Sequence, residues 1–213
     1  MDTPQTSPAV LHGEVSEYDA DGHLAMRAQF VHGVLQGQML RYAGSDGLVQ
    51  RSAYQGGVLD GVTEAYADGK LQARTSYRAG LRDGPMLLFD PGGLLQSEVQ
   101  FLRGRMHGPA LFFHPGGKVV ARRARYGDGL LAGEALDYNE QGLLMARSSY
   151  RMGQLNGERV RYHPNGKVSE VAQFRDDQPL GAPRKFDETG AEQAAAPDPQ
   201  APKRSRLSAW IEG

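Results

Sequence analysis

The chain contains no cysteine and carries almost no net charge, and both features narrow the classes of protein it can be. Without cysteine among its 213 residues, it has neither disulfides nor thiolate metal centres, which fits a reducing compartment. Its 24 lysines and arginines are balanced by 25 aspartates and glutamates, whereas general nucleic-acid binders have a basic excess. We therefore expect a cytoplasmic protein without a nucleic-acid partner.

Long hydrophobic runs are also absent from the sequence. No stretch approaches the roughly 18 consecutive apolar residues that a membrane helix needs. Residues 1–12 have no basic region followed by an apolar core, so we expect no secretory signal there, only a flexible N-terminal segment. Residues 191–213 are rich in Ala, Pro and Gln, which predicts a flexible C-terminal tail.

Glycine, by contrast, is abundant, and its spacing reveals internal repeats. The 28 glycines are about double the usual 7%. Eight of them recur every 24 residues, with one interval of 23 and one of 25: Gly13, Gly37, Gly61, Gly84, Gly108, Gly133, Gly157 and Gly181. Periods of 20 to 50 residues are typical of arrays of small structural units. The sequence thus predicts one array over residues 13–190, with seven full repeats and one partial repeat.

Each repeat has the pattern of a β-hairpin. A first short run ends on an aromatic residue, at Tyr18, Tyr42, Tyr66, Phe89, Phe113, Tyr138, Tyr162 and Phe186. A turn rich in Gly, Asn, Asp and Pro follows, because these residues suit chain reversal. A second run ends on another aromatic, at Phe30, Tyr54, Tyr77, Phe101, Tyr126, Tyr150 and Phe174. We predict an all-β fold: an elongated, twisted or curled single antiparallel meander sheet of about fifteen strands, roughly 70 Å long.

The alternation of strand side chains predicts which face is buried. The position six residues before each second aromatic is always aliphatic, and the position two before it is small or aliphatic. Even spacing predicts that these side chains and both rows of rings share one inner face, over which the sheet curls. Two residues before the first aromatic, the middle repeats have aliphatic residues such as Leu87 and Leu111. Glu64 breaks this pattern.

A row of arginines is predicted on the other, outer face. Three residues before the second aromatic, five repeats have arginine: Arg27, Arg51, Arg74, Arg123 and Arg147. Such a row is suited to bidentate contacts with carboxylates or phosphates of a partner. Alternatively, these side chains are solvated, pair with nearby acids, or cover the sheet with their aliphatic stems.

A second candidate contact surface comes from repeats four and five. There Met86, Leu88, Ala110 and Phe112 replace polar residues found in the other repeats, and we predict them on the same outer face as the arginines. An apolar patch among charged neighbours is typical of a protein interface. It could also be covered by the curled sheet or form a homodimer.

Catalytic and metal-binding patterns are missing. The six histidines are scattered, two of them before proline in turns, and we interpret those two as turn residues. No Ser/His/Asp order, HExxH motif or phosphate-binding loop is present. We therefore expect no enzyme activity, no cofactor and no metal.

The order of glycines and aromatics resembles a known repeat. The segments YADGKLQARTSYRAGLRDG (66–84) and YHPNGKVSEVAQF (162–174) are similar to the bacterial variant of MORN repeats, found in YwqK-like antitoxin proteins. The sequence departs from standard MORN units, whose Y-x-G-x-W-type core is missing, and Trp210 lies outside the array. The resemblance implies a bacterial binding protein, commonly an antitoxin or immunity partner, whose ligand is a cognate toxin or effector.

Two further possibilities remain from the sequence. Other MORN proteins are proposed as scaffolds on anionic lipid, for which the arginine row would serve, although the weak overall charge disfavours membrane binding. The tail segment KRSRLSAW (203–210) could dock on the last strand, bind a partner, or be solvated.

Overall fold

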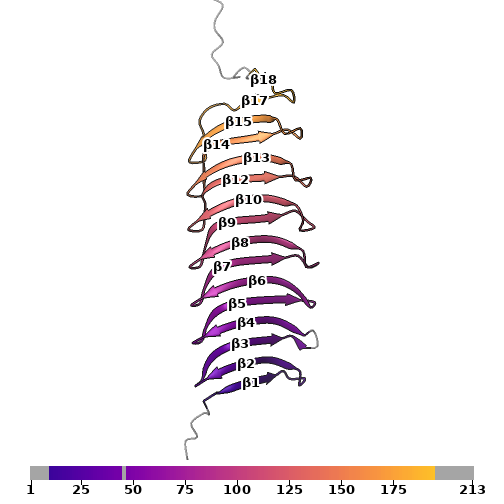
Figure 1. The fold of residues 1–213 in the computed structure, drawn as a ribbon, viewed down its shortest axis with the longest axis vertical. Helices are drawn as coiled ribbons and strands as arrows, with labels where there is room; N and C mark the ends of the chain where they lie inside the picture. Colours follow the sequence, from indigo (N-terminus) through magenta and orange to yellow (C-terminus); the bar gives the residue numbers. More distant parts are fainter. Residues whose placement is uncertain (1–9, 45–46, 195–213) are drawn as a thin grey trace, which may run out of the picture.

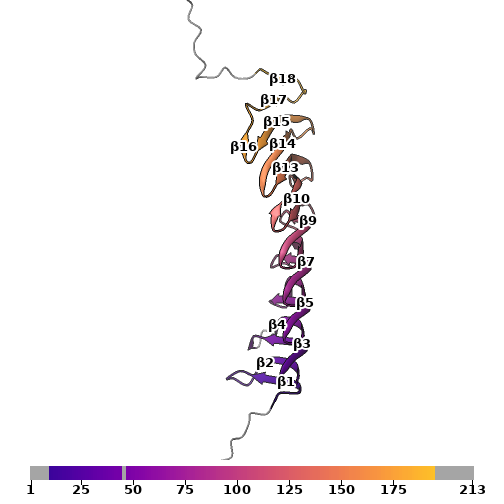
Figure 2. The ribbon, with the colours of Figure 1, turned by 90° about the vertical axis from the view of Figure 1, so that its left-hand side faces the viewer.

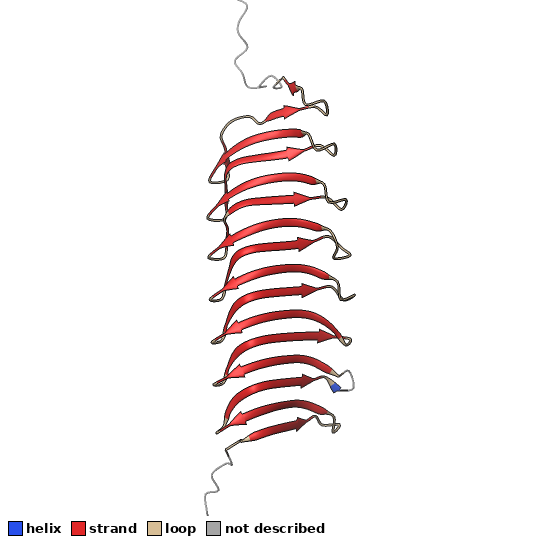
Figure 3. Cartoon of the chain, viewed as in Figure 1, coloured by secondary structure: helices blue, strands red, loops and turns tan. Residues whose placement is uncertain are grey.

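The structure, a computed structural model, describes residues 10–44 and 47–194. They form one antiparallel sheet of 18 strands (Figure 1), and the only helical residue described is Gly44, in a 3₁₀ turn (Figure 3). The strands are β1 (Gly13–Tyr18), β2 (Leu24–Val31), β3 (Val34–Tyr42), β4 (Leu48–Gln55), β5 (Val58–Ala67), β6 (Lys70–Arg78), β7 (Leu81–Phe89), β8 (Leu95–Leu102), β9 (Arg105–Phe113), β10 (Val120–Gly127), β11 (Leu130–Leu131), β12 (Gly133–Tyr138), β13 (Leu144–Arg151), β14 (Gln154–Tyr162), β15 (Val168–Arg175), β16 (Gln178–Pro179), β17 (Arg184–Phe186) and β18 (Glu192–Gln193). The predicted fold class is confirmed.

The sheet is a meander, because strands pair with their neighbours in sequence from β1 to β18. At two places, two short strands occupy the position of one longer strand. The strands β11 and β12 both pair with β10, and β16 and β17 both pair with β15. The pairing of β17 with β18 carries the sheet to Gln193, slightly beyond the predicted end of the array. The predicted tail segment 203–210 lies outside the described residues.

Two-residue turns connect the repeats along one edge of the sheet, on the left in Figure 1. In the turn at Ala79 and Gly80, both residues have positive φ, at 48° and 80°, as a type I′ turn requires. The Gly80 amide donates a hydrogen bond to the Leu59 carbonyl of the previous repeat at 2.8 Å. Asp60 adds a second link, because its Oδ2 accepts the Ala79 amide at 3.0 Å. Successive turns are therefore hydrogen-bonded to one another.

The eight opening glycines of the repeats are needed for their backbone conformation. Gly61 has φ of 112°, and the seven others are also at positive φ, a region that costs other residues free energy. Seven of these glycines lie directly opposite the second aromatic of their repeat: Gly13 and Phe30, Gly37 and Tyr54, Gly61 and Tyr77, Gly84 and Phe101, Gly108 and Tyr126, Gly133 and Tyr150, Gly157 and Phe174. Between repeats, the register shifts at Gly37, Gly61, Gly84, Gly108 and Gly157, so these glycines mark β-bulges.

A second bulge lies near the start of the second strand in each repeat. In β6, Ala73 pairs with Ala65 while Leu71 pairs with Tyr66, so Gln72 is an extra residue. The extra residue breaks the alternation of side chains, and Leu71 lies opposite Tyr66 instead of sharing a face with Tyr77. The same pairing joins the first aromatic and the aliphatic residue in all seven hairpins: Tyr18 and Leu24, Tyr42 and Leu48, Tyr66 and Leu71, Phe89 and Leu95, Phe113 and Val120, Tyr138 and Leu144, Tyr162 and Val168.

The register defines two faces with different central rows. The arginine face has the row Ser16, Arg27, Leu40, Arg51, Glu64, Arg74, Leu87, Glu98, Leu111, Arg123, Leu136, Arg147, Val160, Val171 and Arg184. The small-residue face has the row Val15, Ala28, Met39, Ser52, Thr63, Thr75, Met86, Val99, Ala110, Ala124, Ala135, Ser148, Arg159 and Ala172.

The predicted placement of the aromatic rows on one face is wrong. The first aromatics share the arginine face, since Tyr66 bonds to Glu64 two residues before it. The second aromatics share the small-residue face, two residues after its central row. The bulges place the two rows of rings on opposite faces. Each extra residue shifts the alternation of side chains by one, so residues an even number of positions apart no longer share a face.

Burial is concentrated on the small-residue face. Ala28, Ser52, Ala124 and Ala135 are at most 3% exposed. The described part of the array is a single layer, with no second sheet or helix against either face (Figure 2). Apart from Tyr18, which is 65% exposed, the rings are half-buried, so the sheet does not enclose its aromatic rows as predicted.

Candidate binding faces

The five predicted arginines lie together in one row, but they alternate with first-strand residues. Leu40, Leu87, Leu111 and Leu136 occupy intermediate places on the same face. Neighbouring strands are about 4.8 Å apart, so consecutive arginines are spaced at roughly 10 Å or more. The surface is therefore a mixed row of cations and aliphatic side chains.

Four of the five arginines have carboxylate partners within the sheet. Arg27 Nε lies 3.6 Å from Glu14, and Arg147 lies 2.8 Å from Glu158 and 3.6 Å from Glu134. Arg51 and Arg74 both approach Glu64. These half-exposed ion pairs each contribute about 0–1 kcal/mol. Their main consequence is to neutralise most of the row, as the alternative interpretation of the sequence predicted.

Glu64, the exception in the sequence pattern, is explained by its position between two arginines. Its carboxylate lies 3.6 Å from Arg51 Nη1 and 3.8 Å from Arg74 Nε, and the Tyr66 hydroxyl donates a 2.7 Å hydrogen bond to it. Burial of the ring raises the pKa of Tyr66, and the bond to the Glu64 carboxylate raises it further. The group forms a compact polar cluster at a position that is aliphatic in most other first strands of this row.

Arg123 is the exception among the arginines. It is exposed, and within residues 10–44 and 47–194 no carboxylate lies within ion-pair distance of it. Its direct neighbours across the strands are Leu111 and Leu136. The charge of this arginine is thus available to an external anion.

The apolar set of repeats four and five lies on the small-residue face, opposite the arginines, so its predicted place beside them is wrong. Met86 lies between Thr75 and Val99. Leu88 and Phe112 lie on either side of Ser97. All three apolar side chains are half-exposed. Ala110 is only 1% exposed and offers little area to a partner.

The two turn histidines connect successive repeats, a role that the sequence did not predict. His114 Nε2 lies 2.8 Å from the Tyr138 carbonyl, and His163 Nε2 lies 2.8 Å from the Phe186 carbonyl. A carbonyl only accepts, so Nε2 carries the hydrogen in both. Their place directly after the first aromatic, a repeat length before the acceptor, is the sequence feature that could have indicated this bond.

The first turn of the array brings Asp19, Asp21 and His23 together at the surface. Asp19 Oδ1 already accepts the backbone amides of Asp21 at 3.0 Å and His23 at 2.8 Å. The bond from the His23 amide is the main cause that holds the pKa of Asp19 below its ordinary value. The cluster is explained as an Asx turn.

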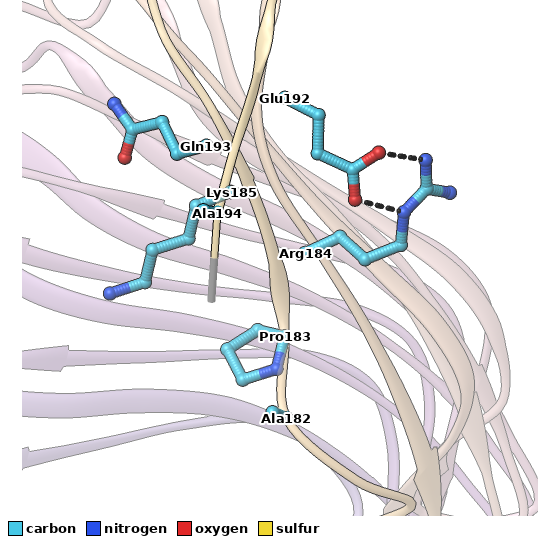
Figure 4. A pocket seen from close by; sticks show the side chains of 7 residues that line it. All are labelled: Ala182, Pro183, Arg184, Lys185, Glu192, Gln193 and Ala194. Atoms are coloured by element: carbon cyan, nitrogen blue, oxygen red, sulfur yellow. Dashed lines mark hydrogen bonds and ion pairs between the residues drawn. The ribbon is translucent and has the colours of Figure 1, made fainter. Parts of the chain in front are cut away.

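A shallow cavity of about 460 Å³ lies at the C-terminal end of the sheet (Figure 4). Arg184 and Glu192 line it and bind each other through two hydrogen bonds of 2.8 Å. That bond lowers the pKa of Glu192 and raises the pKa of Arg184. Lys185 and Gln193 point away from this pair (Figure 4). The titratable groups therefore do not converge on one point in the cavity.

Comparison with known protein families supports the division of the chain into hairpin repeats. Residues 11–32 and 155–176 match the family described as MORN repeat variant. The chain contains this MORN repeat variant twice. The matches coincide with the hairpins β1–β2 and β14–β15 and begin 144 residues apart, six periods of 24. No curated protein matches the chain.

MORN repeats suggest a repeat protein that binds proteins or membranes, and the family is generally non-catalytic. The described residues include no helix that is long and apolar enough to cross a membrane.

Proposed function

We propose that this protein is a non-catalytic protein-binding array that neutralises a cognate bacterial toxin or effector by direct contact. The observation that carries the proposal is the uncovered apolar row on the small-residue face, where Leu88 and Phe112 are half-exposed on a single-layer sheet. Uncovered apolar patches of this kind are favoured sites of protein association.

The surroundings of this row favour a protein partner. On one side the row continues into Arg41 and Gln50, and on the other into the ion pair of Arg122 with Asp137 at 2.8 Å. An apolar centre with a charged rim of both signs is the usual composition of a protein interface. The resemblance to antitoxin proteins supplies the class of partner.

A scaffold on anionic lipid is the second candidate, and the arginine face disfavours it. Such binding requires several free basic residues on one surface, but four of the five arginines have carboxylate partners. Sedimentation with phosphatidylserine liposomes distinguishes the two functions: lipid-dependent pelleting of the whole protein would favour the scaffold.

The proposal is tested by growth rescue in bacteria. The products of the genes that flank its own are expressed singly and then together with this protein, and we expect one of them to stop growth only when expressed alone. The double variant Leu88→Glu, Phe112→Glu should lose the rescue, since two buried charges oppose association.

A matched control distinguishes loss of the surface from general damage. The variant Val58→Glu, Leu81→Glu introduces the same charges at apolar residues that are 46% and 52% exposed beside turns. It should rescue growth like the wild type. Equal behaviour of the two variants, with both folded by circular dichroism, would rule out the Leu88 and Phe112 surface.

A further inference from the structure

The charges of this nearly neutral chain are unevenly distributed along the array. Residues 99–127 contain no aspartate or glutamate, but they contain Arg103, Arg105, Lys118, Arg122, Arg123 and Arg125. Of these six, only Arg122 has an ion-pair partner in the described part of the chain, namely Asp137. The end of the fourth repeat and the fifth repeat are therefore the part of the array where positive charge is not compensated.

Two of these cations lie side by side with aliphatic groups on the arginine face. Arg123 and Arg125 are two residues apart in β10, so they point to the same face, and both are exposed. Arg123 lies between Leu111 and Leu136, and Arg125 lies opposite Pro109. We call Arg123, Arg125, Leu111 and Leu136 the Arg123 site.

Acidic groups limit the site in both directions along the row. Glu98 lies two strands before Arg123, roughly 10 Å away. On the other side, Glu134 of the adjacent strand β12 and Glu158 of β14 both pair with Arg147, which lies two strands from Arg123. A long polyanion or a flat anionic bilayer that reached Arg123 would also meet these carboxylates and be repelled. A short acidic segment avoids them.

We propose that the Arg123 site binds a short acidic and aliphatic segment of the protein partner. Carboxylates of that segment accept charge-assisted hydrogen bonds from the guanidinium groups of Arg123 and Arg125. Its aliphatic side chains pack on Leu111 and Leu136, which are half-exposed. The inference rests on the proposed function and adds a second contact with the same partner, on the face opposite Leu88 and Phe112.

The test uses the full-length protein and the peptide (Glu-Leu)₄ as a labelled probe in fluorescence anisotropy at low salt. The variant Arg123→Gln, Arg125→Gln should weaken binding by about 10-fold or more, because two charge-assisted bonds are lost. The control Arg27→Gln, Arg51→Gln removes the same charge from arginines that already have partners, and should weaken binding less than about 3-fold. Equal losses in the two variants would overturn the inference.

A charge swap excludes a merely structural role for these arginines. Arg123→Glu, Arg125→Glu should lose the (Glu-Leu)₄ peptide and gain (Lys-Leu)₄, whereas a misfolded protein binds neither. Oligothymidylate and phosphatidylserine vesicles are tested in parallel with both Gln variants. If they bind through Arg123 and Arg125 and the acidic peptide does not, the site recognises a polyanion and the inference is wrong.

The outcomes distinguish the inference from the proposed function. Growth rescue that persists unchanged in Arg123→Gln, Arg125→Gln overturns the inference and leaves toxin neutralisation standing. Peptide binding that depends on the two arginines, without rescue by any flanking gene product, supports the inference and contradicts the neutralising role.

Discussion

The hydroxyl of Tyr66 donates a 2.7 Å hydrogen bond to Glu64 Oε2, on the face where Glu64 also lies between Arg51 and Arg74. This cluster replaces an aliphatic position of the central row. Leucine occupies the same place in other repeats, as at Leu40 and Leu87. A leucine at position 64 is therefore a suitable comparison for measuring how much the cluster contributes to stability.

Replacing Glu64 by leucine should change the free energy of unfolding by no more than about 1 kcal/mol. The ion pairs involve arginines that are about half exposed, so solvent screens them, and the new side chain packs as its equivalents do. Glu64→Ala, which loses the packing as well, should be less stable than Glu64→Leu in urea unfolding. A loss of 3 kcal/mol or more for Glu64→Leu would show that the cluster dominates local stability.

The phenol of Tyr66 should titrate above its ordinary value. Burial, followed by the bond to Glu64, raises the pKa of Tyr66 above 10.0. The pKa of Tyr66 is higher in the folded protein than in the unfolded chain. The contribution of Tyr66 to the free energy of unfolding is therefore fully present below pH 10, and it is lost as the pH rises through the pKa of the folded protein. The difference between wild type and Tyr66→Phe in absorbance at 295 nm measures it. Titration of Tyr66 at or below pH 10 would refute the environment described for the ring.

The glycine at the bulge should tolerate alanine less well than a glycine in a turn. A Cβ on Gly61, at φ of 112°, would lie 2.9 Å from the Ala53 Cβ, whereas Gly69, at φ of 70°, has nothing within 4 Å. Gly69→Ala should cost about 1–2 kcal/mol, and Gly61→Ala at least about 1 kcal/mol more through overpacking.

A second substitution checks the cause of this difference. Ala53→Gly removes the methyl group that Gly61→Ala would contact, so the double variant should recover part of the added loss. The midpoints of urea unfolding, at an unchanged m-value, give the stabilities of the wild type, the two single variants and the double variant. Additive effects of the two substitutions would show that the close approach is unimportant.

His163 should hold the last hairpin to the array. Its ring donates to the Phe186 carbonyl at 2.8 Å, and a net bond of this kind contributes about 0.5–1.5 kcal/mol. In His163→Ala, hydrogen exchange over residues 184–193 should accelerate by about 3- to 10-fold, with residues 48–78 unchanged. His107→Ala, a histidine for which the structure describes no side-chain hydrogen bond, is the control. A uniform acceleration along the array would contradict a local role.

The hairpin period was predictable because local backbone needs determine it. Gly80 in a type I′ turn and Gly61 at a bulge both require positive φ, and such requirements appear directly as residue types at fixed spacing. The all-β meander follows from these positions together with the aromatic residues, and the structure confirms it.

The assignment of faces was not predictable in the same way. Leu71 and Tyr77 are an even number of residues apart, yet the extra residue Gln72 places them on opposite faces. A bulge depends on the register with a neighbouring strand, which the alternation rule does not include. The same error placed Met86 beside the arginines. The role of Glu64 also depended on two other strands, although the five arginines were correctly predicted to share a row.

The central claim is that this array neutralises a protein partner by direct contact, and the mass of the complex tests it most directly. The purified protein is mixed with the toxic product identified by growth rescue and analysed by size-exclusion chromatography with light scattering. We predict one species with the summed mass of a 1:1 complex, and two separate peaks for the Leu88→Glu, Phe112→Glu variant. Separate elution of the wild-type protein and the toxic product at micromolar concentration would contradict the account.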